Sequence, residues 1–218
     1  MADKILILAK SGGGKTTSLR NMNPETAVII QVLNKSLPFR GANKWKPWNK
    51  ESSSGSKIHL TSIPIIEKFI HKAIESGKTE IIIDDMVYLI ANQVMREAEN
   101  KEWDKWTLLA RDIYELLKVP DSLPDNVTVY FMTHTEEDSN GNLKMKTAGK
   151  LLDNLITPEG MFTMVLGAEM KDGKFCFKTN KERNSEPYKT PMGMFDSVLI
   201  DNDLKLVHDT KEKYYNGE

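Results

Sequence analysis

The stretch that decides the fold spans residues 9–16 and reads A-K-S-G-G-G-K-T. It follows the apolar run K-I-L-I-L-A at residues 4–9, which is typical of a central strand buried on both faces. Residues 15–22 then read as a helix that Asn23 and Pro24 end. A buried strand, a glycine-rich loop and a helix in this order predict a loop that binds phosphate.

Each residue type in this loop has a physical reason. Small residues let successive backbone N–H groups converge on phosphate oxygens at a helix N-terminus, where the helix dipole also favours negative charge. Lys15 is placed to reach the β and γ phosphates of a nucleotide, and the Thr16 hydroxyl to ligate Mg²⁺. The phosphate-binding residues are therefore predicted to be Ala9, Lys10, Ser11, Gly12, Gly13, Gly14, Lys15, Thr16 and Thr17.

Two acidic residues end another apolar run, E-I-I-I-D-D at residues 80–85. A rigid buried strand that delivers one acid to the carboxyl edge of a sheet suits the Mg²⁺ shell, so we assign Asp84 to the metal. Asp85 has two interpretations. It is a base that activates water, or its side chain caps a helix that begins near Val87.

A further strand, predicted at residues 127–133, is followed by His134. A polar residue at such a strand end can sense the γ phosphate of a bound nucleotide. A lone histidine at a strand end is also often a solvated loop residue. The sequence leaves both interpretations of His134 open.

The remaining segments extend the same alternating pattern of strands and helices. A second buried strand is predicted at 27–33, and short strands at 163–169 and 174–179 are joined by the turn K-D-G. The predicted fold class is α/β: a mainly parallel sheet flanked by helices, with C-terminal β-hairpin additions. We expect a single domain over residues 1–218, interrupted by an irregular excursion at 41–57.

Two segments have the composition of a surface that binds single-stranded nucleic acid. The excursion interleaves lysines with Trp45 and Trp48, which suits base stacking, although tryptophans in an irregular loop also pack it onto the core. The better candidate for a DNA-binding loop is residues 136–150, whose lysines are Lys144, Lys146 and Lys150. A solvated loop is the alternative there.

Bulk composition restricts the partners and the location. The 218 residues carry 30 basic and 31 acidic side chains, so any nucleic-acid partner must use a local patch. Cys176 is the single cysteine, which excludes an internal disulfide framework and indicates a reducing compartment. No apolar stretch is long enough to span a membrane, so we expect a cytoplasmic protein without a membrane partner.

Five segments carry a family resemblance: the loop at 9–16, I-I-I-D-D at 81–85, V-T-V-Y-F-M-T-H at 127–134, G-K-L-L at 149–152 and K-T-P-M-G-M-F at 189–195. In this order they resemble the small RecA-like ATPases encoded by phages, particularly the Sak group, which anneals single-stranded DNA. The resemblance implies a RecA-like core, ATP and Mg²⁺ at the loop, single-stranded DNA as partner, and self-assembly into a ring or filament. For a phage-encoded protein the location is the host cytoplasm.

The chain departs from this family at the catalytic acid. RecA-like enzymes usually carry a glutamate just after the second strand, whereas residues 31–37 read Q-V-L-N-K-S-L. Either Asp85 substitutes as the base or hydrolysis is slow. The sequence also places no arginine near the loop, so we expect cations from a neighbouring subunit to reach the nucleotide, and solvated surface charge is the alternative. These cations are Lys178, Lys181 and Arg183.

Three functions use the same loop. The first is an ATPase that anneals or remodels single-stranded DNA, the second is a nucleotide-gated DNA-binding or scaffold oligomer with little catalysis, and the third is a small-molecule kinase. Kinases of that kind clamp phosphate with an arginine-rich lid, because the guanidinium fork matches phosphate geometry. The five arginines of this chain are scattered, so the kinase ranks last.

Overall fold

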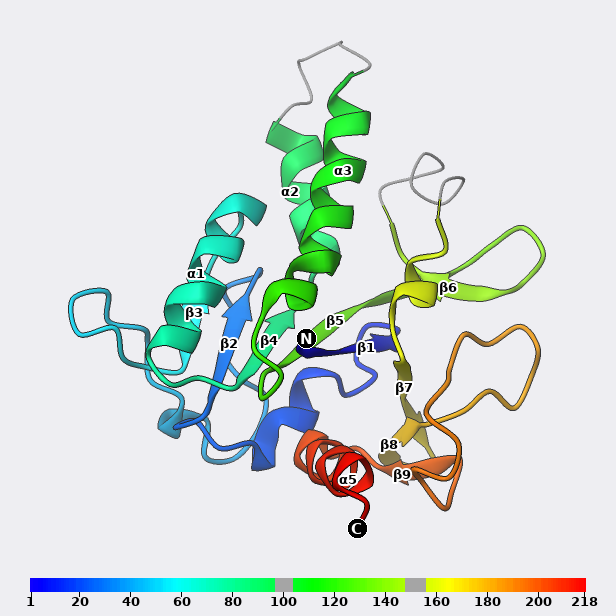
Figure 1. Ribbon diagram of the computed structural model, residues 1–218. Helices are drawn as coiled ribbons and strands as arrows, with labels where there is room; N and C mark the ends of the chain where they lie inside the picture. The colour runs from blue at the N-terminus through cyan, green and yellow to red at the C-terminus, as the bar shows by residue number, and fades with distance from the viewer. Residues whose placement is uncertain (97–103, 148–155) are drawn as a thin grey trace.

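The computed structural model describes residues 1–96, 104–147 and 156–218 (Figure 1). Within these ranges nine strands form one sheet. The strands are β1 Asp3–Ala9, β2 Ala27–Gln31, β3 Lys57–His59, β4 Glu80–Asp84, β5 Thr128–Glu137, β6 Leu143–Met145, β7 Met164–Lys171, β8 Lys174–Lys178 and β9 Leu199–Asp201. Their order across the sheet is β3-β2-β4-β5-β1-β7-β8-β9, and β6 pairs with β5.

Strands β3 through β7 in that order run parallel, whereas β8 and β9 are antiparallel additions at one edge. The predicted fold class is therefore confirmed: an α/β protein with a mainly parallel sheet and a C-terminal antiparallel extension. One detail differs from the sequence interpretation. The first strand of the expected C-terminal hairpin, β7, also pairs in parallel with β1, so it belongs to the central sheet.

Helices cover both faces of the sheet, as Figure 1 shows. Their bounds are α1 Ile63–Glu75, α2 Val87–Arg96, α3 Asp104–Lys118 and α5 Leu204–Asn216, with the 3₁₀ helices η1 Thr16–Asn21, η2 Ala42–Lys44, η3 Val119–Ser122 and η4 Pro158–Met161. One core cluster joins α1, α2 and α3 to side chains such as Leu6 and Ile81. A second joins η1 and α5 to the opposite face, at Ile5 and Ile82. Successive strand residues thus point into different cores, as the period of a strand requires.

The strand order brings the chemistry-bearing ends together. Strand β5 lies between β1 and β4, with Ala9 beside His134 in register. Gln31 at the end of β2 is in register with Asp84 at the end of β4. Because these strands are parallel, their carboxyl ends meet at one edge of the sheet.

Local structure departs from the sequence expectation at several points. The helix expected at 15–22 is a 3₁₀ helix, η1. The excursion at 41–57 is ordered and docks through Trp45, which is buried. Helix α5 was not predicted, although Asp203 caps its N-terminus and Gly217 ends it at a φ of 76°. The G-K-L-L segment at 149–152 lies outside the described residues.

Among the described residues, no helix combines the length and the apolar character needed to cross a membrane.

Candidate nucleotide-binding site

A cavity of about 310 Å³ opens at the carboxyl edge of the sheet, beside the glycine-rich loop. The loop forms one wall, from Ser11 to Thr17. The other walls come from four separate segments: the turn after β2, the turn from β4 into the start of α2, the second half of β5 and the strand β8. The side chains that these segments contribute are Lys35, Pro38, Asp85, Tyr88, His134 and Phe175.

Glycine is required in the loop for two different reasons. Gly12 and Gly14 have φ values of 78° and 93°, a left-handed conformation that other residues adopt only at a cost. Gly13 does not have a positive φ, but a Cβ there would lie 2.7 Å from the carbonyl oxygen of Ala168 on β7. The loop is therefore packed directly against the backbone of the neighbouring strand.

Lys15 is 6% exposed, so nearly all of its side chain is enclosed by the site. Burial lowers its pKa, and the nearby carboxylates of Asp85 and Asp84 partly oppose that shift. An enclosed ammonium group at the start of η1 is a strong binder of anions, because water screens it poorly. This placement agrees with the predicted role of Lys15 as a phosphate ligand.

The Thr16 hydroxyl donates to the carboxylate of Asp84, at 3.2 Å from one oxygen and 3.0 Å from the other. Asp84 is 2% exposed, and burial, followed by the charge of Asp85, raises its pKa to about 6. The hydrogen bond from Thr16 and the charge of Lys15 oppose that shift. Burial of two adjacent carboxylates therefore disfavours the charged form of Asp84, even with two lysines nearby.

A hydroxyl and a carboxylate 3 Å apart are oxygen donors that suit Mg²⁺, which takes few protein ligands and completes its shell with phosphates and water. No group of three or more His, Cys, Asp or Glu residues able to hold a metal occurs in the described ranges. The chemistry of this pair fits Mg²⁺, and Thr16 and Asp84 are the residues that would hold it.

Asp85 lies just beyond β4 with a φ of 62°, a conformation that is strained for an aspartate. The turn aims its carboxylate into the cavity, where it contacts the ammonium group of Lys35 and lies 3.6 Å from His134 Nε2. The interpretation of Asp85 as a side-chain cap of α2 is wrong, because the carboxylate faces these two side chains. Only its backbone carbonyl serves the helix, by accepting from the N–H of Tyr88 at 3.0 Å.

His134 is half-buried within β5, which continues beyond it to Glu137, and it lines the cavity, so it is not a solvated loop residue. Its ring meets that of Tyr88 edge-on at 6.0 Å between centroids. Burial, with the charge of Lys15 next in importance, lowers the pKa of His134. A neutral imidazole beside Asp85 can donate one hydrogen bond and accept another, as a sensor of phosphate requires.

Sequence reasoning missed Lys35, which lies in the turn after β2 and pairs with Asp85. The sequence interpretation noted only that this turn lacks a glutamate. Burial disfavours the charged form of Lys35, but the hydrogen bond to Asp85 and its charge outweigh burial and raise the pKa of Lys35. The sequence did contain a signal for this residue: Lys35 lies in the stretch where RecA-like enzymes usually carry a glutamate.

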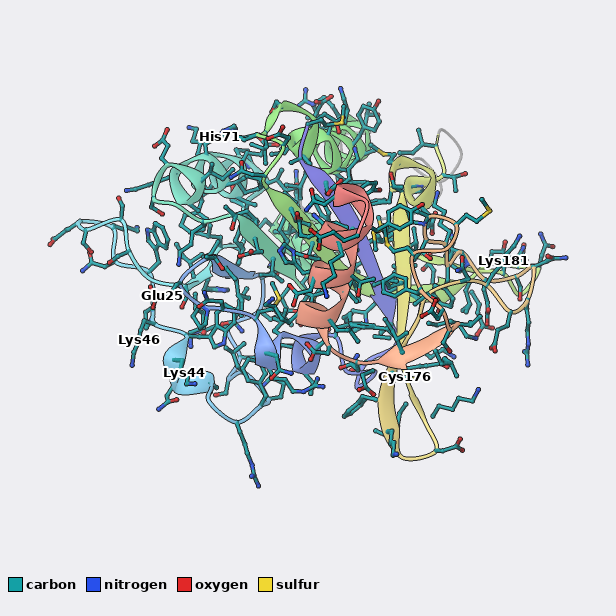
Figure 2. All side chains as sticks on the ribbon, turned by 60° about the horizontal axis from the view of Figure 1, so that its bottom comes forward. Glu25, Lys44, Lys46, His71, Cys176 and Lys181 are labelled. Carbon is teal, nitrogen blue, oxygen red and sulfur yellow. The ribbon has the colours of Figure 1, made fainter. Side chains whose placement is uncertain are left out.

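The three cations expected to reach the nucleotide of a neighbouring subunit differ in whether they already have a partner within the chain. Lys178 is buried and pairs with Glu182 at 2.7 Å and Glu186 at 2.9 Å. Its charge is already compensated by these two glutamates of the same chain. The prediction that Lys178 reaches the nucleotide of a neighbouring subunit is therefore wrong. Lys181 lies at the periphery of the molecule (Figure 2). Arg183 lines a second cavity, of about 590 Å³, which the loop also borders from Ala9 to Gly13.

The two tryptophans expected to stack on DNA bases pack against the protein instead. Trp45 is 3% exposed and packs in the core, and Trp48 meets Phe69 of α1 edge-on at 4.9 Å between centroids. Both tryptophans fix the excursion to the domain, so the stacking interpretation is wrong for Trp45 and loses its support for Trp48.

The lysines of the expected DNA-binding loop lie on and beyond the β5–β6 hairpin. Lys144 pairs with Glu136 across this hairpin at 3.1 Å. Lys146 is exposed just after β6, and its backbone N–H donates to the carbonyl of His134 at 2.8 Å. The hairpin therefore connects this surface to the nucleotide cavity. Lys150 falls outside the described residues.

Fold and site together define an α/β protein with a glycine-rich loop at the carboxyl end of β1 and an acidic strand end two strands away. No protein-family model matches the chain, and no curated protein matches it. Among solved structures it is similar to a KaiC-like protein from the hyperthermophilic archaeon Pyrococcus horikoshii OT3. That similarity has a TM-score of 0.43 at 13% identity, covering 80% of this chain and 76% of the other.

Proposed function

We propose that this chain is a RecA-like P-loop ATPase that binds ATP with Mg²⁺ and acts on single-stranded DNA as a homo-oligomer. One observation carries the nucleotide part. A buried lysine, Lys15, and a hydroxyl–carboxylate pair, Thr16 with Asp84, flank a single cavity at a glycine-rich loop. An acid delivered by a strand two positions from the loop strand supports the RecA-like assignment.

The polar side chains at the loop and at the carboxyl ends of the strands have roles in hydrolysis under this proposal. Lys15 binds the β and γ phosphates and stabilises charge on the leaving oxygen. Bound Mg²⁺, held through Thr16 and Asp84, would neutralise charge on the same phosphates. Asp85 accepts the proton of the attacking water, and His134 donates a hydrogen bond to the γ phosphate.

The DNA part rests on position and on the family resemblance. The chain runs from β5 through β6 to Lys146, whose backbone N–H donates to the carbonyl oxygen of His134 at 2.8 Å. Single-stranded DNA bound at Lys146 would therefore lie close to His134. A change at the γ phosphate could therefore alter the DNA surface through β5. Self-assembly would let Lys181 and Arg183 approach the nucleotide of a neighbouring copy.

The second candidate function is a nucleotide-gated oligomer with little catalysis. The observation that favours it is the pairing of Asp85 with Lys35, because a carboxylate in an ion pair is a weaker base than a free one. A kinase remains the least favoured function. Arg20, which lies closest to the loop in sequence, donates to the backbone carbonyl of Asn202 and so serves the fold.

Phosphate release from ATP, measured with and without single-stranded DNA, separates these functions. The proposed ATPase releases phosphate in the presence of Mg²⁺, more rapidly with DNA, and the Lys15→Ala variant does not. A gated oligomer binds ATP and DNA but shows no release above the variant. Transfer of phosphate to a small molecule in place of water would indicate the kinase.

A further inference from the structure

The turn after β2 places a second cation in the nucleotide cavity. Lys35 and Lys15 both line this cavity, together with Asp85. The Lys35 ammonium group contacts the Asp85 carboxylate. The side chain of Lys35 is 54% exposed, whereas that of Asp85 is 6% exposed. Lys35 thus covers a buried carboxylate from the side that faces solvent.

The backbone of this turn is anchored at both ends. Gln31 is buried, and its side-chain amide donates to the carbonyl oxygen of Lys35 at 3.0 Å. The N–H of Val32 donates to the carbonyl of Asp84 at 3.2 Å, which ties the turn to the metal-binding strand end. Leu37 is buried in the second core. The Cα of Lys35 is therefore fixed, while its half-exposed side chain can change partner.

Charge decides which partner Lys35 prefers when a nucleotide enters. In the absence of an anion, Asp85 supplies the nearest strong counter-charge. Burial is the main cause that lowers the pKa of Lys15, and the like charge of Lys35 in the same cavity adds to that shift. A γ phosphate between them would carry more negative charge than one carboxylate and would relieve the repulsion between the two lysines.

We propose that Lys35 binds the γ phosphate of ATP from within the same chain, leaving Asp85 for the phosphate when the nucleotide enters. This inference rests on the proposed function. It assigns the γ-phosphate cation to the turn where a RecA-like glutamate was expected. It also makes discrimination between ATP and ADP a property of the single chain, so that trans cations are not required for it.

The experiment measures the affinities of ATP and ADP separately by calorimetry with Mg²⁺ present. Three proteins are compared: the wild type, Lys35→Ala, and Lys44→Ala as the matched control. Lys44 is an exposed lysine of the 41–57 excursion whose side chain points outward (Figure 2). Lys35→Ala should lose about tenfold to a hundredfold in ATP affinity, the usual range for a charge-assisted contact, with ADP affinity within about twofold.

Lys44→Ala should bind both nucleotides like the wild type. Lys35→Gln keeps most of the side-chain length without the charge, so it should show the same selective loss of ATP affinity. It replaces Lys35→Ala if the alanine variant does not fold. The role of Lys35 would be overturned if the variant bound ATP as tightly as the wild type does. It would also be overturned if the variant lost affinity for ATP and for ADP by the same factor. A folded wild type that binds neither nucleotide would instead refute the proposed function itself.

Discussion

Replacing Asp84 by asparagine should stabilise the nucleotide-free protein at neutral pH. The substitution keeps the shape of the side chain and an oxygen that accepts from Thr16, but it removes a buried charge next to Asp85. Burial raises the pKa of Asp84 from 3.8 to about 6. A shift of about two units corresponds to about 3 kcal/mol.

The sign follows from proton binding. Between pH 3.8 and about 6 the folded protein holds a proton on Asp84 that the unfolded chain has lost. The free energy of unfolding therefore falls as pH rises through this window, and the full cost is present above it. Asp84→Asn removes the cost, so its gain over the wild type should grow from near zero at pH 3.8 to about 3 kcal/mol at pH 7.5.

Urea unfolding, followed by tryptophan fluorescence in EDTA across this pH range, measures the difference directly. In a chain of this length 3 kcal/mol corresponds to a rise in melting temperature of roughly 6 to 12 °C. Asp125→Asn, at an exposed carboxylate, is the control and should change little. A variant that is no more stable than the wild type at pH 7.5 would refute the electrostatic reasoning. Mg²⁺ with ATP should stabilise the wild type and fail to stabilise Asp84→Asn.

Three further outcomes test other parts of the site. Gly13→Ala should cost about 1–3 kcal/mol in urea unfolding, because its Cβ would meet the Ala168 carbonyl, whereas Gly160→Ala, with its nearest contact at 4.0 Å, should be tolerated. Asp85→Asn should slow hydrolysis strongly in a protein that stays folded by circular dichroism; a folded variant that hydrolyses ATP at the wild-type rate would contradict the assignment as base. Removing the three lysines of the DNA-binding loop should flatten the salt dependence of DNA affinity, and an unchanged slope would rule that surface out.

The sequence predicts those parts of the molecule that depend on local pattern. The glycine-rich loop needs glycines at positions with a positive φ or a close backbone neighbour, and Gly12 and Gly13 provide one example of each. Apolar runs such as 80–84 identify buried parallel strands, because both of their faces are covered. Asp84 then follows as the residue at the strand end.

The parts that could not be predicted depend on contacts between distant segments. Lys35 meets Asp85 across 50 positions of sequence, and only the β2–β4 register brings the two together. The burial of Trp45 and the pairing of Lys178 with Glu186 are of the same kind. Composition shows that a cation or an aromatic ring is present, but it does not show whether the chain already supplies that side chain with a partner.

The most direct test of the central claim is the calorimetric titration of ATP, with Mg²⁺, into the wild type and into Lys15→Ala. Lys15 is enclosed by the cavity but lies outside the two apolar cores, so its removal should leave the fold intact. The wild type should bind one ATP per chain with a saturable isotherm, and the variant should show no measurable binding, with matching circular dichroism spectra. Equal ATP affinity in the folded variant would contradict the assignment of this loop as the phosphate-binding site.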